Sequence, residues 1–377
     1  MRMLCKRPGR AWFEPLEPRL LLDGHVAVWV SKGDLIIRGD FAANEITVTP
    51  GVNPGDFEIE GDNETIVNNE PRVTMTGVTD DFNIRMGDGR DVVFLDGVTV
   101  PDALTVRTWT GTDAVVISES HVLGATTIKT HNANDDVAIA NSRFDGKVYL
   151  QTKAGHEVIG IGRTQFGRGL TIEAGTGWDE IVVDEIIVGG KLTVSSEEGN
   201  DVVRVLTSQV VGQTEIKTRS GDDELTVTNS EFGGAAVLKT GWGHDRLTID
   251  PTTFHADVKL ATARGWDDVY IEDSLFEGKL TLETNEDPDF VILVNSEFQG
   301  KVVLDSGLAD DDVLITGDVF QQSISTKLKG GDDNLFVSNT AWAEGSMAGG
   351  AGRDRFIGAG GNTGTLPDVA GFKLGEL

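Results

Sequence analysis

The stretch RSGDDELTVTNSEFGG, residues 219–234, places three acidic side chains directly before a short alternation of apolar and polar residues. Asp222, Asp223 and Glu224 repel one another, whereas Leu225 and Val227 follow at the two-residue spacing of a half-buried strand. The stretch raises the question of why charge is concentrated where a strand is about to be buried. The other copies of this pattern along the chain supply most of the answer.

Asp223 belongs to a column of acidic residues that recurs every 22 positions without an insertion. The column consists of Asp91, Asp113, Asp135, Glu157, Asp179, Asp201, Asp223, Asp245, Asp267, Asp289, Asp311 and Asp333. Aspartate and glutamate make up 61 of the 377 residues, so an unbroken acidic series of this length does not arise by chance. A fixed internal period of this kind determines the architecture of a whole chain.

The other positions of the repeat are equally regular. Apolar residues stand two and four positions after each acid, and a large apolar residue such as Phe232 stands nine positions after it. A second alternating pair follows, as at Leu280 and Leu282, and glycine precedes most acids by two positions, as at Gly221. Between the second pair and the glycine lies a small polar column of Thr108, Thr130, Thr152, Thr218, Thr240, Thr262 and Thr284. We interpret it as a stack of hydroxyl groups at a corner of the fold.

Each repeat therefore holds two strands, one short apolar corner and a Gly-Asp turn. The inward residues of one repeat form no closed core, so they must be buried against the neighbouring copies. Stacked copies give an all-β fold, a single-stranded parallel β-helix of about 12 coils that rises roughly 4.8 Å per coil. A period of 22 residues with three apolar positions resembles the right-handed parallel β-helix of the pectin-lyase type, and this resemblance implies a right-handed coil.

The formal net charge of −29 excludes some classes of partner. So acidic a chain repels nucleic acid and anionic lipid surfaces, and we expect cations or neutral or basic surfaces as its partners. The single cysteine, Cys5, rules out an internal disulfide framework. No apolar run reaches the length of a transmembrane helix, so we expect no membrane span.

The N-terminal segment contains a recognisable motif. Residues 13–22 read FEPLEPRLLL and follow a basic leader with Arg2, Lys6, Arg7 and Arg10. This resembles the LEPR-XLL motif at the start of large, repetitive proteins exported by planctomycete-type bacteria. The resemblance implies export to the cell surface or the extracellular space and carries no information about activity.

We therefore divide the chain into four parts. Residues 1–24 form the export or sorting segment, and residues 25–80 lack the period but show short strand-like runs separated by Gly, Pro and Asn. Because an open end of a solenoid exposes unpaired backbone groups, we interpret residues 25–80 as an N-terminal cap of β-hairpins. Residues 81–348 form the β-helix, and residues 349–377 form a final turn and a C-terminal tail.

The final turn carries the most specific motif of the chain. The stretch GGAGRDRFI, Gly349 to Ile357, resembles the G-G-x-G-x-D-x-U-x nonapeptide of repeat-in-toxin calcium-binding β-rolls. The resemblance implies Ca²⁺ as the cofactor, Asp354 as a ligand and Phe356 as a buried anchor. Degraded versions of the motif precede three column acids, and most other copies lack its first glycine. The candidate metal ligands are Asp354, then Asp91, Asp179 and Asp245, then Asp113, Asp135, Glu157, Asp201, Asp223, Asp267, Asp289, Asp311 and Asp333.

Two explanations of the acidic column stay open at this point. Carboxylates stacked about 4.8 Å apart repel by roughly 0.9 kcal/mol even in bulk water, and Ca²⁺ between successive turns would offset this repulsion. Alternatively, each aspartate accepts hydrogen bonds from backbone N–H groups of its own turn, which requires no metal. The second explanation also accounts for the preference for aspartate, because glutamate is one methylene longer.

The sequence favours a non-catalytic protein. Outward acids at Asp136, Glu180, Glu224, Asp268 and Asp312 recur on alternate coils and are typical of a solvated face. No nucleophile motif, phosphate loop or zinc spacing is present, so we assign neither catalytic nor organic cofactor-binding residues. We expect an exported surface, adhesive or matrix solenoid stabilised by calcium. Its partners would be extracellular glycans or other surface proteins, and the sequence leaves its oligomeric state open.

The alternative is a carbohydrate-active or carbohydrate-binding β-helix, such as a polysaccharide lyase or hydrolase. Trp178 and Trp266 each stand directly before a column acid, at a turn where an indole ring could stack on sugar. A groove with converging aspartate and arginine on neighbouring coils would favour this alternative. A smooth, evenly charged prism would favour the structural one.

Overall fold

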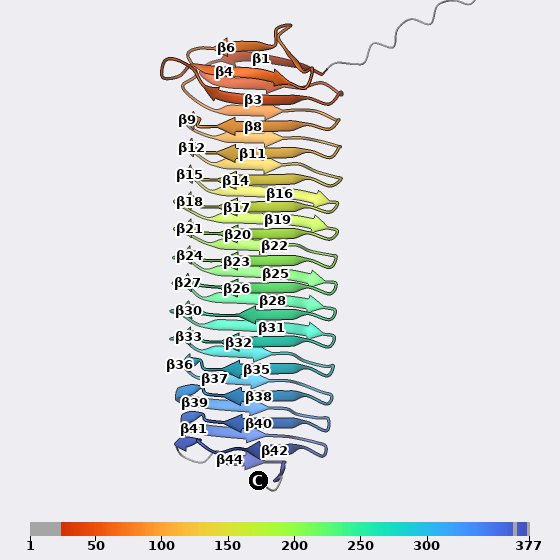
Figure 1. Cartoon of the computed structure of the whole chain (residues 1–377), viewed down its shortest axis with the longest axis vertical. Helices are drawn as coiled ribbons and strands as arrows, with labels where there is room; N and C mark the ends of the chain where they lie inside the picture. Colours follow the sequence, from red (N-terminus) through yellow and green to blue (C-terminus); the bar gives the residue numbers. More distant parts are fainter. Residues whose placement is uncertain (1–23, 365–367, 375–377) are drawn as a thin grey trace, which may run out of the picture.

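The coils of the protein stack into one long rod (Figure 1). The computed structural model describes residues 24–364 and 368–374. The Cys5 and LEPR-XLL positions lie outside these residues. Within the described residues every regular element is a β-strand, and strands of successive coils pair in parallel with a register of 22 residues. The predicted all-β solenoid is thereby confirmed, whereas the right-handed coil stays a prediction.

The first face of the rod is formed by the strands that follow the column acids. In the strands of this face between residues 92 and 338, alternate side chains are buried because the two apolar positions after each acid point inward, as Leu225 and Val227 do. These strands are β8 (Val92–Asp96), β11 (Ala114–Ser118), β14 (Asp136–Ala140), β17 (Val158–Gly162), β20 (Glu180–Asp184), β23 (Val202–Leu206), β26 (Glu224–Thr228), β29 (Arg246–Ile249), β32 (Asp268–Glu272), β35 (Phe290–Val294), β38 (Asp312–Thr316), β40 (Asn334–Ser338), β42 (Arg355–Gly358) and β45 (Lys373–Leu374).

A column of short strands turns the chain from the first face to the second. Its large apolar residues are buried, and in five pairs of successive coils their phenyl rings stack with centroids 4.8–5.5 Å apart. The short strands are β9 (Thr99–Val100), β12 (His121–Val122), β15 (Arg143–Phe144), β18 (Gln165–Phe166), β21 (Ile187–Val188), β24 (Gln209–Val210), β27 (Ser230–Phe232), β30 (Thr252–Phe254), β33 (Leu275–Phe276), β36 (Glu297–Phe298) and β43 (Thr363–Gly364).

The second face contains the second apolar pair of each repeat and returns the chain to the acidic corner. Its strands are β7 (Phe82–Arg85), β10 (Leu104–Arg107), β13 (Thr126–Lys129), β16 (Val148–Ala154), β19 (Leu170–Thr176), β22 (Leu192–Ser195), β25 (Thr214–Ser220), β28 (Ala236–Trp242), β31 (Val258–Arg264), β34 (Leu280–Glu283), β37 (Val302–Asp305) and β44 (Asp368–Ala370). Near the C-terminus, β39 (Val319–Lys327) and β41 (Ala341–Ala348) span both the short corner and this face.

The repeat changes by one residue at the C-terminal end. The pairing of β39 with β41 shifts register between Phe320 and Ser323, so that the spacing between paired residues falls from 22 to 21. Asp354 accordingly follows Asp333 by 21 positions. Beyond residue 348, β42 pairs in parallel with β40, so the repeat-in-toxin-like stretch continues the solenoid as a further coil.

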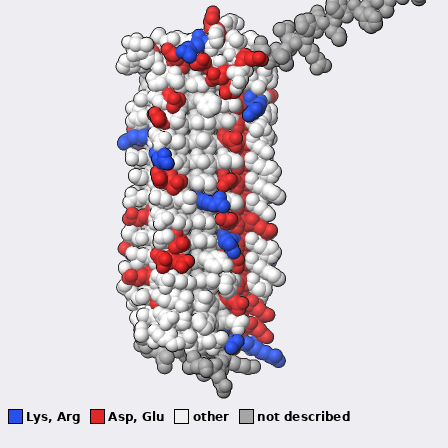
Figure 2. Space-filling model, viewed as in Figure 1, with Lys and Arg blue, Asp and Glu red and all other residues white. Residues whose placement is uncertain are grey.

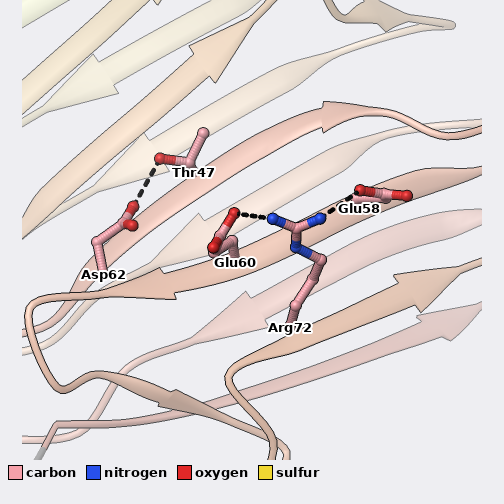
Figure 3. Close-up of polar contacts among 5 residues, drawn as sticks. All are labelled: Thr47, Glu58, Glu60, Asp62 and Arg72. Carbon is pink, nitrogen blue, oxygen red and sulfur yellow. Dashed lines mark hydrogen bonds and ion pairs between the residues drawn. The ribbon is translucent and has the colours of Figure 1, made fainter.

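The N-terminal end is covered by hairpins, as the turn-rich sequence of residues 25–80 predicts. The cap strands are β1 (His25–Ser31), β2 (Asp34–Arg38), β3 (Glu45–Pro50), β4 (Phe57–Asp62), β5 (Ile66–Val67) and β6 (Arg72–Met75). Strands β2 and β3 pair in parallel with β7 and β8, and antiparallel partners then extend both sheets. On the outer surface of the cap, Arg72 binds Glu58 and Glu60, and Thr47 donates a hydrogen bond to Asp62 (Figure 3).

The glycine that stands two positions before most column acids lies in close contact with the neighbouring coil. Gly199 has a φ of +137°, and a Cβ added there would lie 1.3 Å from the carbonyl oxygen of Gly177 in the preceding coil. A side chain at Gly199 would therefore require these two coils to shift, whereas Ala133, Asp287 and Ala309 occupy the same phase in coils whose acids keep the equivalent hydrogen bond. The glycine therefore lets the turn pass close enough for the acid beside it to contact the neighbouring backbone.

Candidate functional site

The acidic residues form one continuous buried column along a corner of the rod. We call the twelve acids from Asp91 to Asp333, together with Asp354, the carboxyl column. Every member has an exposed fraction of 4% or less. The acids of the sequence pattern are thus inside the rod, whereas the acidic side chains visible along its length in Figure 2 lie on the surface.

Each aspartate of the column is held by the backbone of the preceding coil. Asp91 N–H donates to Oδ1 of Asp113 at 2.8 Å, and equivalent bonds of 2.8–3.2 Å continue up to Asp354. At the cap, Asn44 N–H donates to Asp91. The hydrogen-bonding explanation of the column is therefore correct in kind but wrong in its donor, because the N–H belongs to the neighbouring coil and not to the acid's own turn.

Glu157 is the exception within this column. Both of its carboxyl oxygens are buried without a hydrogen-bond partner among the described residues, so the bond expected from Asp135 N–H is missing. The extra methylene of glutamate carries the carboxyl group past the position that aspartate occupies. This agrees with the preference for aspartate in the repeat.

The second carboxyl oxygen of each aspartate is left without a partner. Within the described chain, Oδ2 of every aspartate in the column is buried and accepts no hydrogen bond. The buried threonine hydroxyls lie beside the carboxyl groups of their own coils, as Thr108 lies beside Asp113. They form no continuous hydroxyl stack, because Thr152, Thr218 and Thr284 donate to carbonyl oxygens of the next coil.

Burial makes these carboxyl groups hard to ionise. Removal of the charged form from water raises the pKa values, while the N–H from the preceding coil lowers them in part. The pKa is raised to about 6 for Asp135, Asp245 and Asp311, about 7 for Asp91, Asp179, Asp223, Asp267 and Asp333, about 8 for Asp289 and about 9 for Glu157. Burial also raises the pKa values of Asp113 and Asp201. Burial therefore favours the protonated form of the twelve acids from Asp91 to Asp333.

The distances between acidic side chains show which of them could share one metal ion. Among the described residues, the only three acidic, histidine or cysteine side chains whose ligand atoms lie within 4.8 Å of one another are Asp34, Asp80 and Asp81, in and beside the cap. In the column, each coil with an aspartate instead contributes one unpaired carboxyl oxygen, and several coils add an unpaired hydroxyl such as that of Thr240. Calcium binding by the column and by Asp354 stays a prediction.

A second column of side chains binds the backbone at the opposite end of the first face. It consists of Ser120, Ser142, Thr164, Ser208, Ser230, Thr252, Ser274, Ser296, Asp318 and Thr340 and is called the hydroxyl column here. Ser120 N–H donates to Oγ of Ser142 at 3.1 Å, and the same Oγ donates to the Ala140 carbonyl at 2.7 Å. This column was not predicted from the sequence, although its seven-residue offset from the acids is constant.

Exposed aromatic residues gather at the turns beside the carboxyl column. The backbone N–H of Trp178 donates to Nδ1 of His156 at 2.9 Å, and the backbone N–H of Trp266 donates to Nδ1 of His244 at 3.1 Å. Both indoles are exposed, at 66% and 67%. The structure therefore brings each predicted tryptophan together with a histidine of the preceding coil, a pairing that the 22-residue spacing already contained.

Three of the five outward acids named in the sequence analysis are bound to arginine. Arg204 lies between Glu180 and Glu224 at 3.1 and 3.3 Å, and Arg246 binds Asp268 at 3.2 Å. The two glutamates stand two coils apart, so Arg204 links their side chains across the intervening coil. This arrangement resembles the solvated face that the sequence favours.

Comparison with known proteins adds no family assignment. No family model, no curated protein and no solved structure matches the chain. In the described ranges, residues 24–364 and 368–374, no helix has the length and apolar character needed to cross a bilayer. The class defined by the fold is a β-solenoid of about 13 turns with a 22-residue repeat.

Proposed function

We propose that the protein is a non-catalytic, exported rod that acts as an adhesive or matrix component at a cell surface. The observation that carries this proposal is the regularity of the solenoid: paired strands follow one another at one register from Phe82 to Thr316. A stack of this kind holds its side faces at fixed positions over its whole length. The motif at residues 13–22 and the basic leader before it support export.

Export and display are tested in cells that produce the full chain. We expect an antibody against the rod to label intact cells, and external protease to remove the label. A cytoplasmic protein of the same cells serves as the control for lysis. Retention of the protein inside intact cells would contradict the proposal.

The non-catalytic role is tested separately on the purified protein. We expect it to co-sediment with cell-wall or matrix polysaccharides without releasing reducing ends or unsaturated sugars from them. Polygalacturonate and neutral glucans are the substrates that separate a lyase from a hydrolase. Steady release of either product would establish the alternative, a carbohydrate-active β-helix.

Calcium stabilisation is the second part of the proposal. Its support is the nonapeptide at Gly349–Ile357 together with the unpaired, buried Oδ2 atoms of the carboxyl column, Asp354 included. Carboxylate and hydroxyl oxygens are the ligands that Ca²⁺ prefers. Calcium bound at these turns would compensate the charge of ionised carboxylates that the folded corner otherwise disfavours.

The measurement is the unfolding midpoint in EDTA, in millimolar Ca²⁺ and in millimolar Mg²⁺ at pH 8. We expect a rise that is specific for Ca²⁺, because a ligand that binds only the folded state stabilises it. Asp354→Asn should reduce the rise if the final turn binds the ion. Equal midpoints in EDTA and Ca²⁺ would contradict the calcium part and leave the surface role untouched.

A further inference from the structure

A shallow depression on the turn edge of the rod brings two exposed indoles together. Its volume is about 410 Å³, and it lies where the turns after β28 and β31 meet. The side chains that define it are Trp242, Trp266, His244, Arg264, Asp222 and Asp287. Trp242 and Trp266 are 63% and 67% exposed, so two large apolar surfaces face solvent at one place.

The backbone of neighbouring coils fixes the polar groups of the depression. His244 N–H donates to Oδ1 of Asp222 at 2.9 Å, and Gly265 N–H donates to Oδ2 of Asp287 at 3.1 Å. Nδ1 of His244 accepts a hydrogen bond from the backbone N–H of Trp266, so a neutral imidazole carries its proton on Nε2. Acceptors and a donor are therefore held in place beside the indoles before any ligand arrives.

Aromatic contacts fix the two indoles in turn. The rings of His244 and Trp266 meet edge to face, with centroids 5.9 Å apart. The Arg264 guanidinium lies 5.9 Å from the ring centroid of Trp242 and pairs with Glu286 at 3.3 Å. Such contacts reduce the side-chain freedom that a ligand would otherwise have to remove on binding.

These groups match the chemistry of a sugar ring. A pyranose has an apolar face of C–H groups that can lie on an indole, and a rim of hydroxyls that can bond to carboxylates, imidazole and guanidinium. Charge narrows the class further, because Asp222, Asp287 and Glu286 outnumber Arg264 and repel uronate or sulfated sugars. We propose that the depression at Trp242 and Trp266 binds neutral pyranose units of a polysaccharide, an inference that rests on the proposed surface role and names its ligand class.

The rod contains an internal control for this site four coils earlier. Trp178 has the same bond to a histidine and nearly the same exposure as Trp266. At the equivalents of Trp242 and Arg264, however, it has Ala154 and Thr176, which pair with each other as Trp242 and Arg264 do. An exposed tryptophan alone is therefore present at both places, whereas two indoles with a guanidinium are present at one.

The experiment measures binding of the full chain to soluble neutral β-glucans and mannans by affinity electrophoresis and calorimetry. We expect Trp242→Ala and Trp266→Ala each to weaken binding about tenfold, because each variant loses one aromatic face that the bound sugar would cover. Trp178→Ala should leave binding unchanged. Circular dichroism and the unfolding midpoint of each variant show whether the fold is intact.

Polygalacturonate and poly-lysine serve as the competing probes. Binding of polygalacturonate in preference to neutral glycans, or of poly-lysine alone, would overturn the proposal, as would equal losses in Trp178→Ala and Trp266→Ala. If the chain binds neutral glycans and neither Trp242→Ala nor Trp266→Ala changes its affinity, this site is overturned. The proposed function is then left intact. A chain retained inside intact cells would instead contradict the proposed function itself.

Discussion

Two corners of the rod hold neighbouring coils together through different side chains, carboxyl groups at one and mostly hydroxyl groups at the other. At the carboxyl column and at the hydroxyl column, a side chain accepts the backbone N–H of the equivalent residue one coil earlier, as Asp113 does for Asp91 and Ser142 does for Ser120. In both places the bond ties neighbouring coils where the strands end. The two columns thus flank the first face and hold its coils at a common spacing.

The corners differ in what happens to the rest of the side chain. The Ser142 hydroxyl donates its proton to the Ala140 carbonyl in its own coil, so it is satisfied while neutral. The Asp113 carboxyl leaves its buried Oδ2 without a partner in the described part of the chain, and burial raises its pKa. A hydroxyl corner is therefore independent of pH, whereas a carboxyl corner makes stability depend on protons or on a cation.

The largest expected effect is the pH dependence of the whole rod. Because burial raises the pKa values of the twelve column acids from Asp91 to Asp333, with five of them at about 7, the folded state keeps protons that the unfolded chain has released above about pH 4. The free energy of unfolding in EDTA should therefore fall as pH rises from 5 to 8, by on the order of 10 kcal/mol.

Guanidinium unfolding at pH 5, 6, 7 and 8 measures this dependence. Millimolar Ca²⁺ is the informative addition, because calcium binds ionised carboxylates and should reduce or reverse the slope if the column takes up the ion. A free energy of unfolding that rises with pH in EDTA would contradict the assignment of a proton-retaining column.

Breaking the hydroxyl corner should cost the same free energy at every pH. Ser142→Ala removes the acceptor of Ser120 N–H, and a buried N–H without a partner costs about 1–3 kcal/mol. Ser118→Ala is the matched control, since its hydroxyl contacts Asp96 at the surface and its loss should change stability by less than about 0.5 kcal/mol. A loss for Ser142→Ala that varies between pH 5 and 8 would undermine the contrast between the corners.

One position of the hydroxyl column holds an aspartate where its other members are serine or threonine. Asp318 accepts Ser296 N–H at 2.8 Å, as a serine would, but its other oxygen is buried without a partner in the described structure, and burial raises its pKa to about 7. Asp318→Ser should therefore stabilise the rod at pH 8 by about 1–2 kcal/mol and change little at pH 5. Equal effects of Asp318→Ser at both pH values would show that the carboxyl is not the source of the pH dependence.

The sequence predicts the stacking of the coils well and their bonding less well. Because one coil equals one period, the phase of Leu225 or Phe232 alone shows which residues lie above one another and which are buried. The same phase does not show which N–H an aspartate accepts, since the donor can lie in its own turn or in the coil before. That choice depends on the close approach that Gly199 permits.

The depression was beyond the repeat analysis for a related reason. Trp266 stood out because it precedes a column acid, but Trp242 lies three positions before Asp245 and so occupies a different phase. The period does place Arg264 opposite Trp242, as the pairing of β28 with β31 confirms, but it does not show that Trp242 and Trp266 line one depression. A site that occurs once in the chain is therefore not revealed by the positions that repeat every 22 residues.

The smallest expected effect concerns the single glutamate of the carboxyl column. Glu157→Asp should place a carboxyl oxygen within reach of Asp135 N–H, as at the other coils, and stabilise the rod by about 1 kcal/mol at pH 5. Glu157→Gln is the control, because it removes the ionisable group, whose pKa is raised to about 9, without shortening the side chain. Chemical unfolding compares the three proteins. A gain for aspartate that exceeds the gain for glutamine shows that reach matters, whereas equal gains would show that the length of the side chain is not what disfavours glutamate at this corner.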